Sequence, residues 1–242
     1  MQREYHRWQS PNLNREMELL VFGHAGAKVL IFPTRSGRFY EYERLRLTDQ
    51  LRDKVEAGHL QLYCLDSLDS ESFYCWWAQP DGRIQRHLQY ETYILKEVFP
   101  LMTEKNPHPC VIAHGCSLGA FHAANIAFRH PERFRKLVAF SGRYDLTLRI
   151  DCFTDLFDGY YDEQIYFNTP THYLPKLEDP TILEALRRME IILTIGREDP
   201  FRKNNEDLSA ILRSKAIVHQ LHLWDDRAHS GYYWRRMVRI YL

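Results

Sequence analysis

The sequence has no hydrophobic segment long enough to cross a membrane. Its longest unbroken apolar run is the six residues Phe73–Ala78, whereas a membrane helix needs about 20. The first ten residues, MQREYHRWQS, have no apolar centre and do not resemble a signal peptide. Cysteine is also scarce, since the chain has five and no two of them form a Cys-x-x-Cys pair. These absences predict a cytoplasmic protein with free thiols.

The sequence also has no excess charge of either sign. Lys+Arg and Asp+Glu both number 32 in the 242 residues, so the formal net charge is zero. This balance does not favour binding to nucleic acid, which usually needs a basic surface. The 12 histidines include no HExxH or Cys/His finger spacing. Glycine-rich phosphate loops are absent too, so we expect no metal ion and no cofactor.

What the sequence does contain is the composition and pattern of one globular α/β domain spanning residues 1–242. Hydrophobic residues make up 45% and charged residues 26%, and no Pro/Gly/Ser-rich linker divides the chain. Extended segments at 3–9 and 16–22 flank a turn at 11–14, which predicts an antiparallel hairpin. Six short apolar runs then predict buried strands. They lie at residues 28–33, 60–66, 110–114, 136–141, 191–196 and 220–225.

Helical periodicity separates these runs. We expect helices at residues 87–105, 118–130, 180–189, 204–214 and 231–241. Residues 145–180 have no clear period and are expected to form an irregular excursion over the sheet. Alternating strands and helices predict a mostly parallel central sheet with helices on both faces, preceded by the antiparallel hairpin.

One short motif points to chemistry. Residues 115–119 read Gly-Cys-Ser-Leu-Gly, which is G-x-S-x-G, directly between an apolar strand and a helix rich in small residues. This is the setting of a nucleophile elbow, in which glycines allow a strained turn that exposes the serine hydroxyl. Ser117 is therefore the candidate nucleophile. Cys116 and His114 are expected to be buried neighbours.

A serine hydroxyl needs a base to accept its proton and an acid to orient that base. In this setting the chain order is serine, acid, histidine. Asp199 follows one predicted strand and His229 follows the last one, so both should lie with Ser117 at the carboxyl edge of the sheet. Glu198 is the alternative acid. Asp225 and Asp226 are too close in sequence to His229 to be good partners.

The reaction also needs two N–H groups that stabilise the oxyanion. The residue after the nucleophile should supply one of them, which makes Leu118 a candidate. The loop after the strand at 28–32 should supply the other. Arg35 is the preferred donor in this loop, and Ser36 is the alternative.

These residues resemble a known family. The chain is similar, from about residue 15 to 240, to the esterase family of the α/β-hydrolases, which includes esterase D (S-formylglutathione hydrolase), feruloyl and enterochelin esterases and the mycolyltransferases. Besides the elbow, four segments match in order: Phe32–Arg35, Ser72–Trp77, Ser141–Tyr144 and Gly196–Asp199. Two positions depart from the pattern: Gly231 replaces a frequent tryptophan, and Trp76 replaces a frequent acid of the mycolyltransferases. They argue against mycolyl transfer.

The resemblance implies an α/β-hydrolase fold and a serine esterase that needs no cofactor. It would hydrolyse a small-molecule ester through an acyl-enzyme on Ser117, as a monomer or homodimer. Two alternatives stay open: an acyltransferase that uses the same site, and a catalytically silent binding module.

Two further features bear on the substrate. The aromatic stretch Phe73–Trp77 should either line the pocket or pack on the core. Several arginines also follow the predicted strands, so the substrate should carry an acidic group, with Arg35 or Arg143 as its anchor, unless nearby carboxylates neutralise them. They are Arg35, Arg143, Arg197, Arg202 and Arg227.

Overall fold

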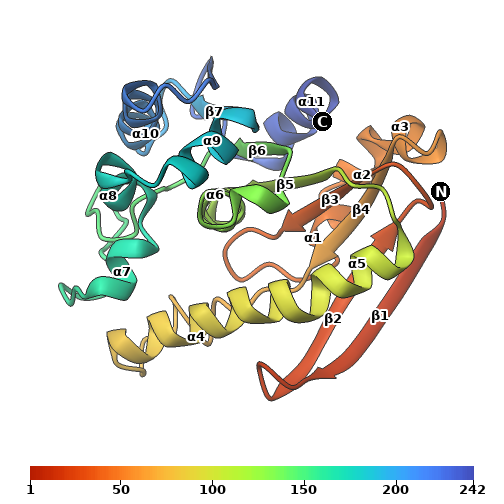
Figure 1. Ribbon diagram of the computed structural model, residues 1–242, viewed down its shortest axis with the longest axis horizontal. Helices are drawn as coiled ribbons and strands as arrows, with labels where there is room; N and C mark the ends of the chain where they lie inside the picture. Colours follow the sequence, from red (N-terminus) through yellow and green to blue (C-terminus); the bar gives the residue numbers. More distant parts are fainter.

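A computed structural model describes all 242 residues and contains one eight-stranded sheet (Figure 1). The strand order is β1-β2-β4-β3-β5-β6-β7-β8. Strands β3 to β8 are parallel, whereas β1 and β2 are antiparallel to each other and β2 is antiparallel to β4. The predicted mostly parallel sheet with an N-terminal hairpin is therefore confirmed. The strands are β1 Arg3–Ser10, β2 Arg15–Phe22, β3 Ala27–Phe32, β4 Leu60–Leu65, β5 Val111–Cys116, β6 Lys136–Phe140, β7 Glu190–Gly196 and β8 Gln220–Trp224.

The main helices lie where the periodicity predicts them, with one early start. The helix expected at 87–105 begins at Pro80, because proline suits the first turn of a helix, and it widens into a π-helical turn before Pro100. Proline cannot donate the next helical hydrogen bond, so the wider turn fits its position. The segments are α4 Pro80–Tyr93, the π turn Ile94–Val98, α5 Phe99–Lys105, α6 Leu118–Arg129, α9 Pro180–Arg188, α10 Arg202–Ser214 and α11 Gly231–Tyr241.

Several short helices were not predicted. Three lie between β3 and β4, where the sequence predicts no element, and two lie within the excursion at 145–180. Each has four or five residues, too few to show a 3.6-residue period. They are α1 Glu41–Arg44, α2 Leu47–Gln50, α3 Arg52–Glu56, α7 Glu163–Phe167 and α8 Pro170–Tyr173.

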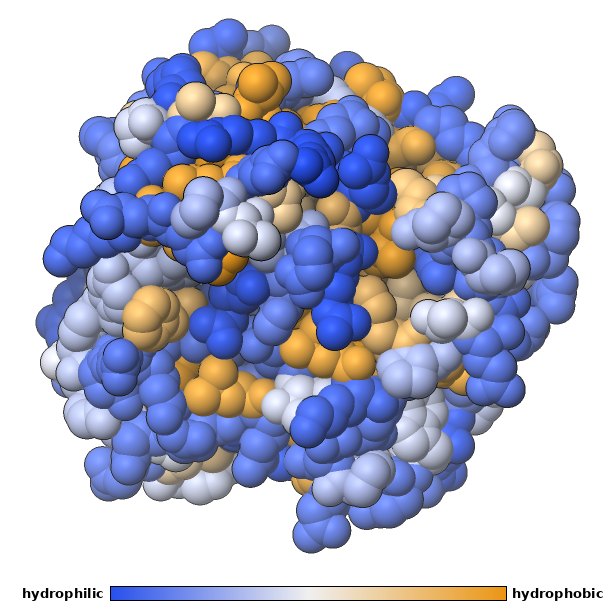
Figure 2. Space-filling model, viewed as in Figure 1, coloured by the Kyte–Doolittle hydropathy of each residue, from blue (hydrophilic) through white to orange (hydrophobic).

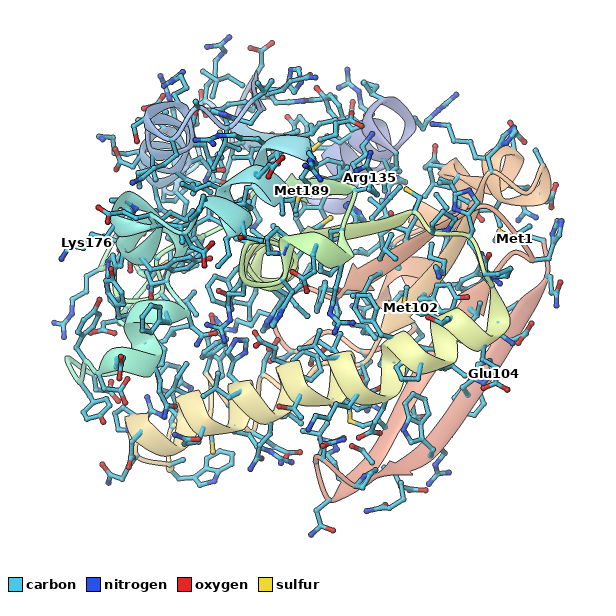
Figure 3. All side chains as sticks on the ribbon, viewed as in Figure 1. Met1, Met102, Glu104, Arg135, Lys176 and Met189 are labelled. Carbon is cyan, nitrogen blue, oxygen red and sulfur yellow. The ribbon has the colours of Figure 1, made fainter.

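Helices cover both faces of the sheet, as predicted. One hydrophobic core packs α4, α5, α6, α9 and α10 against one face. A second packs α1–α3 and α11 against the other. Figure 3 shows Met102 on the sheet side of α5 and Glu104 on its outer side. This sandwich leaves the carboxyl ends of the strands, with their loops, as the place where side chains from several elements meet.

The outer surface of the molecule is mostly polar in the view of Figure 2. In the face shown in Figure 2, hydrophobic residues lie in patches between hydrophilic ones. No helix of the chain is both long and apolar enough to span a membrane.

Candidate active site

Ser117 occupies a strained turn between β5 and α6. Its backbone has φ 57° and ψ −123°, a conformation that costs a non-glycine residue about 1–3 kcal/mol. The Ser117 N–H donates to the carbonyl of Phe140 at 2.8 Å, which ties the turn to β6. A Cβ on Gly115 would lie 2.2 Å from the backbone of Gly119, and a Cβ on Gly119 would lie 2.3 Å from the carbonyl oxygen of Phe32. Both glycines of the motif are therefore needed for close packing.

The loops after β7 and β8 bring an acid and a base to this serine. Nε2 of His229 lies 2.9 Å from Oγ of Ser117, and Nδ1 of His229 lies 2.6 Å from Oδ2 of Asp199. The two loops touch closely, since a Cβ on Gly196 would lie 2.0 Å from the carbonyl oxygen of Arg227. The structure thus joins three predicted residues into one hydrogen-bonded chain.

The alternative acids lie elsewhere. Asp199 is buried, and its second oxygen accepts the N–H of Phe201 at 2.9 Å, so the carboxylate is fixed from both sides. Glu198 is exposed. Asp225 pairs with Arg197, and Asp226 accepts a hydrogen bond from a tyrosine of α11.

The histidine loop is supported by a contact that the sequence pattern does not reveal. Nε1 of Trp234 donates to Oγ of Ser141 at 3.2 Å, and Ser141 donates to the carbonyl of Ala228 at 2.9 Å. The Trp234 ring also lies 5.7 Å from the His229 ring. A tryptophan five residues after the histidine therefore packs against it, although position 231 is glycine.

Within the turn Thr34–Gly37 after β3, only the N–H of Arg35 is free, because that of Gly37 donates to the carbonyl of Thr34. The N–H of Thr34 donates to Glu41 and that of Ser36 donates to Asp69, while the N–H of Arg35 has no acceptor within the protein. The N–H of Leu118 is the first in α6, so it has no acceptor within that helix. The geometry thus favours Arg35 over Ser36 as the second donor.

Comparison with known proteins places the chain in a family. Residues 11–236 match the family model described as "Putative esterase".

The chain belongs to this esterase family.

As the sequence predicts, the protein is a carboxylic ester hydrolase with the α/β-hydrolase fold. The fold is similar to that of a ferulic acid esterase at 16% identity and a TM-score of 0.77, covering 100% of this chain and 96% of the other. It is also similar to an S-formylglutathione hydrolase from Agrobacterium tumefaciens at 17% identity and a TM-score of 0.73, covering 98% and 91%. The fold is similar as well to that of an S-formylglutathione hydrolase from Staphylococcus aureus, at 16% identity and a TM-score of 0.69. This match covers 98% of this chain and 94% of the other. No curated protein sequence matches significantly.

Two titratable neighbours of the elbow in this esterase are buried. Burial lowers the pKa of His114 to about 4, although its hydrogen bond to the Val138 carbonyl opposes this shift. Burial also raises the pKa of the Cys116 thiol well above its ordinary value. A neutral buried thiol is a poor nucleophile. No group of three or more His, Cys, Asp or Glu side chains is arranged to hold a metal ion.

The aromatic stretch divides between core and surface. Phe73 is fully buried and stacks edge-on against Phe121, whereas Trp76 is 50% and Trp77 81% exposed. Tyr74 lies between them, with the Arg35 guanidinium 4.5 Å from its ring centre. The stretch therefore adjoins the loop that carries the free N–H, but only its second half is accessible to a ligand.

The arginines near the site mostly have partners. The buried guanidinium of Arg143 donates to four backbone carbonyls, those of residues 145, 146, 148 and 154. Our expectation that Arg143 could anchor a substrate is therefore wrong. Arg197 pairs with Asp225 and Arg202 with a glutamate of α10. Arg35 is exposed and has no carboxylate within 4.0 Å.

Proposed function

We propose that the protein is a serine esterase in which Ser117, His229 and Asp199 act as a catalytic triad. The observation that carries this proposal is the continuous chain from Ser117 Oγ through His229 to Asp199, with distances of 2.9 and 2.6 Å. Such an arrangement lets the histidine accept the serine proton while the carboxylate orients the ring and stabilises the imidazolium.

The reaction runs in two steps. Ser117 Oγ bonds to the ester carbonyl carbon as Nε2 of His229 takes its proton. The bond from the carbonyl carbon to the ester oxygen then breaks, and His229 gives the proton to that oxygen, so that the alcohol leaves and the acyl group stays on Ser117. Water next attacks the acyl carbon with His229 as base; the bond to Oγ breaks, and His229 returns the proton to Oγ, which releases the acid and restores Ser117. In both steps the N–H groups of Leu118 and Arg35 hold the oxyanion.

The substrate class follows from the family and from the composition of the site. A carboxylic ester of a small molecule needs only the serine, the base and the two N–H donors, so no cofactor enters the reaction. Because similar folds include a ferulic acid esterase and S-formylglutathione hydrolases, feruloyl esters and thioesters belong in the first substrate panel.

The test is a hydrolysis assay on p-nitrophenyl esters of several acyl lengths, feruloyl esters and thioesters. Ser117→Ala should reduce kcat by about 10⁴- to 10⁶-fold, because triad residues act as a unit. Cys116→Ala is the matched control, since this neighbouring thiol is buried and should not react. A Ser117→Ala protein with the wild-type rate would overturn the proposal. Analysis of products with an added alcohol separates hydrolysis from acyl transfer.

A further inference from the structure

The loop that presents the Arg35 N–H is a tight turn under backbone strain. The N–H of Gly37 donates to the carbonyl of Thr34 at 2.8 Å, which closes the turn. Its third residue, Ser36, has φ 55°. A left-handed third residue is typical of a type II turn, which prefers glycine there. A serine in this conformation persists only when surrounding contacts fix it.

A buried carboxylate holds one end of the turn. The Glu41 side chain, at the start of α1, accepts the Thr34 N–H at 2.7 Å on one oxygen and the Thr34 hydroxyl at 2.8 Å on the other. A Cβ on Gly37 would lie 2.5 Å from the Glu41 carboxylate. Glycine at this position therefore allows the carboxylate to reach the turn.

A second buried carboxylate holds the other end. Asp69, in the loop after β4, is 1% exposed. Its Oδ2 accepts the Ser36 N–H at 3.0 Å, and its Oδ1 accepts from Nε2 of His122 at 3.1 Å. His122 lies one helical turn after Leu118 in α6. Asp69 thus connects the turn to the helix that carries the other oxyanion donor.

We propose that Glu41 and Asp69 are positioning residues that aim the Arg35 N–H at the oxyanion. They accept the backbone N–H groups immediately before and after Arg35, so that the Arg35 N–H is the only one in the turn without an acceptor. This inference rests on the proposed serine mechanism and assigns neither carboxylate any contact with substrate. Their role is geometric, because a negative charge near an oxyanion would by itself raise the energy of the transition state.

That distinction makes the amide variants informative. In Asp69→Asn the side-chain oxygen can still accept from Ser36 while the NH₂ group donates to His122. In Glu41→Gln the oxygen can still accept the Thr34 N–H while the NH₂ group donates to the Thr34 hydroxyl. Both variants remove the charge and keep an acceptor for the turn N–H, while the second contact reverses its direction, with the Thr34 hydroxyl or the Nδ1-protonated tautomer of His122 as acceptor. Alanine at either position removes the bonds as well.

The experiment measures kcat and KM on p-nitrophenyl acetate for the four variants, with folding checked by circular dichroism. We expect Glu41→Ala and Asp69→Ala to lower kcat about 10- to 100-fold, less than complete loss of a donor, with KM within about threefold. The amide variants should stay within about threefold of wild type. The affinity for a trifluoromethyl ketone, whose adduct carries the oxyanion, should fall in parallel with kcat/KM.

Gly37→Ala gives a second route if an alanine variant fails to fold, because the added Cβ would displace the Glu41 carboxylate. It should lower kcat with little change in KM. Gly82→Ala is its matched control, since a Cβ there would meet no atom within 4 Å. Wild-type kcat in Glu41→Ala, Asp69→Ala or Gly37→Ala would overturn the positioning role. So would amide variants as slow as the alanine variants. Retained activity in Ser117→Ala would instead overturn the serine mechanism.

Discussion

Oδ2 of Asp199 lies 2.6 Å from Nδ1 of His229, while its other oxygen accepts a backbone N–H. We expect Asp199→Asn to keep the fold but hold the imidazole in the wrong tautomer, lowering kcat about 10⁴-fold. Glu198→Gln is the matched control, because this neighbouring carboxylate is exposed, and it should stay within about twofold. Steady-state kinetics on one p-nitrophenyl ester checks both. A reversed order of the two effects would assign the acid to Glu198.

The three residues of the proposed triad could be found in the sequence because each lies in a local pattern at a strand end. Ser117 stands in a five-residue motif, and Asp199 and His229 follow apolar runs. The preference for Arg35 over Ser36 has no such local pattern behind it. It depends on Asp69, which comes from a loop more than thirty residues away and has no fixed spacing to either candidate.

Side-chain roles were harder to predict than strands, because they too depend on residues that are not close in sequence or that follow no regular pattern. The sheet is specified by short apolar runs, which are local. The environment of Arg143 depends on how residues 145–154 wrap around its guanidinium, and that wrapping leaves no period in the sequence. The helices α1–α3 are too short for a period, although they carry Glu41.

Acid should destabilise the fold through buried histidines. Burial lowers the pKa of His114 to about 4, and burial with the nearby His122 lowers that of His87 to about 3. An unfolded histidine takes up a proton below about pH 6.5, whereas the folded one stays neutral until its own lower pKa. The unfolded state therefore binds more protons in this window, and stability falls as the pH decreases, by about 1.4 kcal/mol per pH unit for each such group.

Urea unfolding at pH 7 and pH 5 measures this effect. His114→Asn keeps an N–H donor for the Val138 carbonyl but cannot titrate. It should reduce the loss of unfolding free energy between the two pH values, whatever its effect at pH 7. His24→Asn, at an exposed position, should leave the loss unchanged. An equal pH dependence in wild type and His114→Asn would contradict the assignment.

The exposed half of the aromatic stretch should affect substrate preference. Trp77→Ala should change the relative kcat/KM among acyl lengths while the unfolding free energy stays within about 0.5 kcal/mol. Phe73→Ala should instead cost about 3–5 kcal/mol of stability, because it opens a cavity in the core. If Trp77→Ala lowers kcat/KM by the same factor for all esters, this residue does not belong to the substrate site.

Arg35 should favour an ester that carries a carboxylate. Its guanidinium lies on the Tyr74 ring without an acidic partner, and the backbone N–H of the same residue is the proposed oxyanion donor. The kcat/KM ratio of mono-p-nitrophenyl succinate to p-nitrophenyl acetate should fall about two- to fivefold in Arg35→Ala, since exposed ion pairs are weak. High salt should reduce the ratio in wild type. Arg197→Ala, which loses an arginine already paired with Asp225, is the control. An unchanged ratio in Arg35→Ala would exclude the anchor.

The measurement that tests the central claim most directly is labelling with a fluorophosphonate probe, followed by peptide mass spectrometry. An activated serine reacts with this probe, whereas an ordinary serine hydroxyl does not. We predict one adduct, on the peptide that contains Ser117. It should be absent in Ser117→Ala and strongly slowed in His229→Ala. No labelling of the wild-type protein, or an adduct on another residue, would contradict the proposed mechanism.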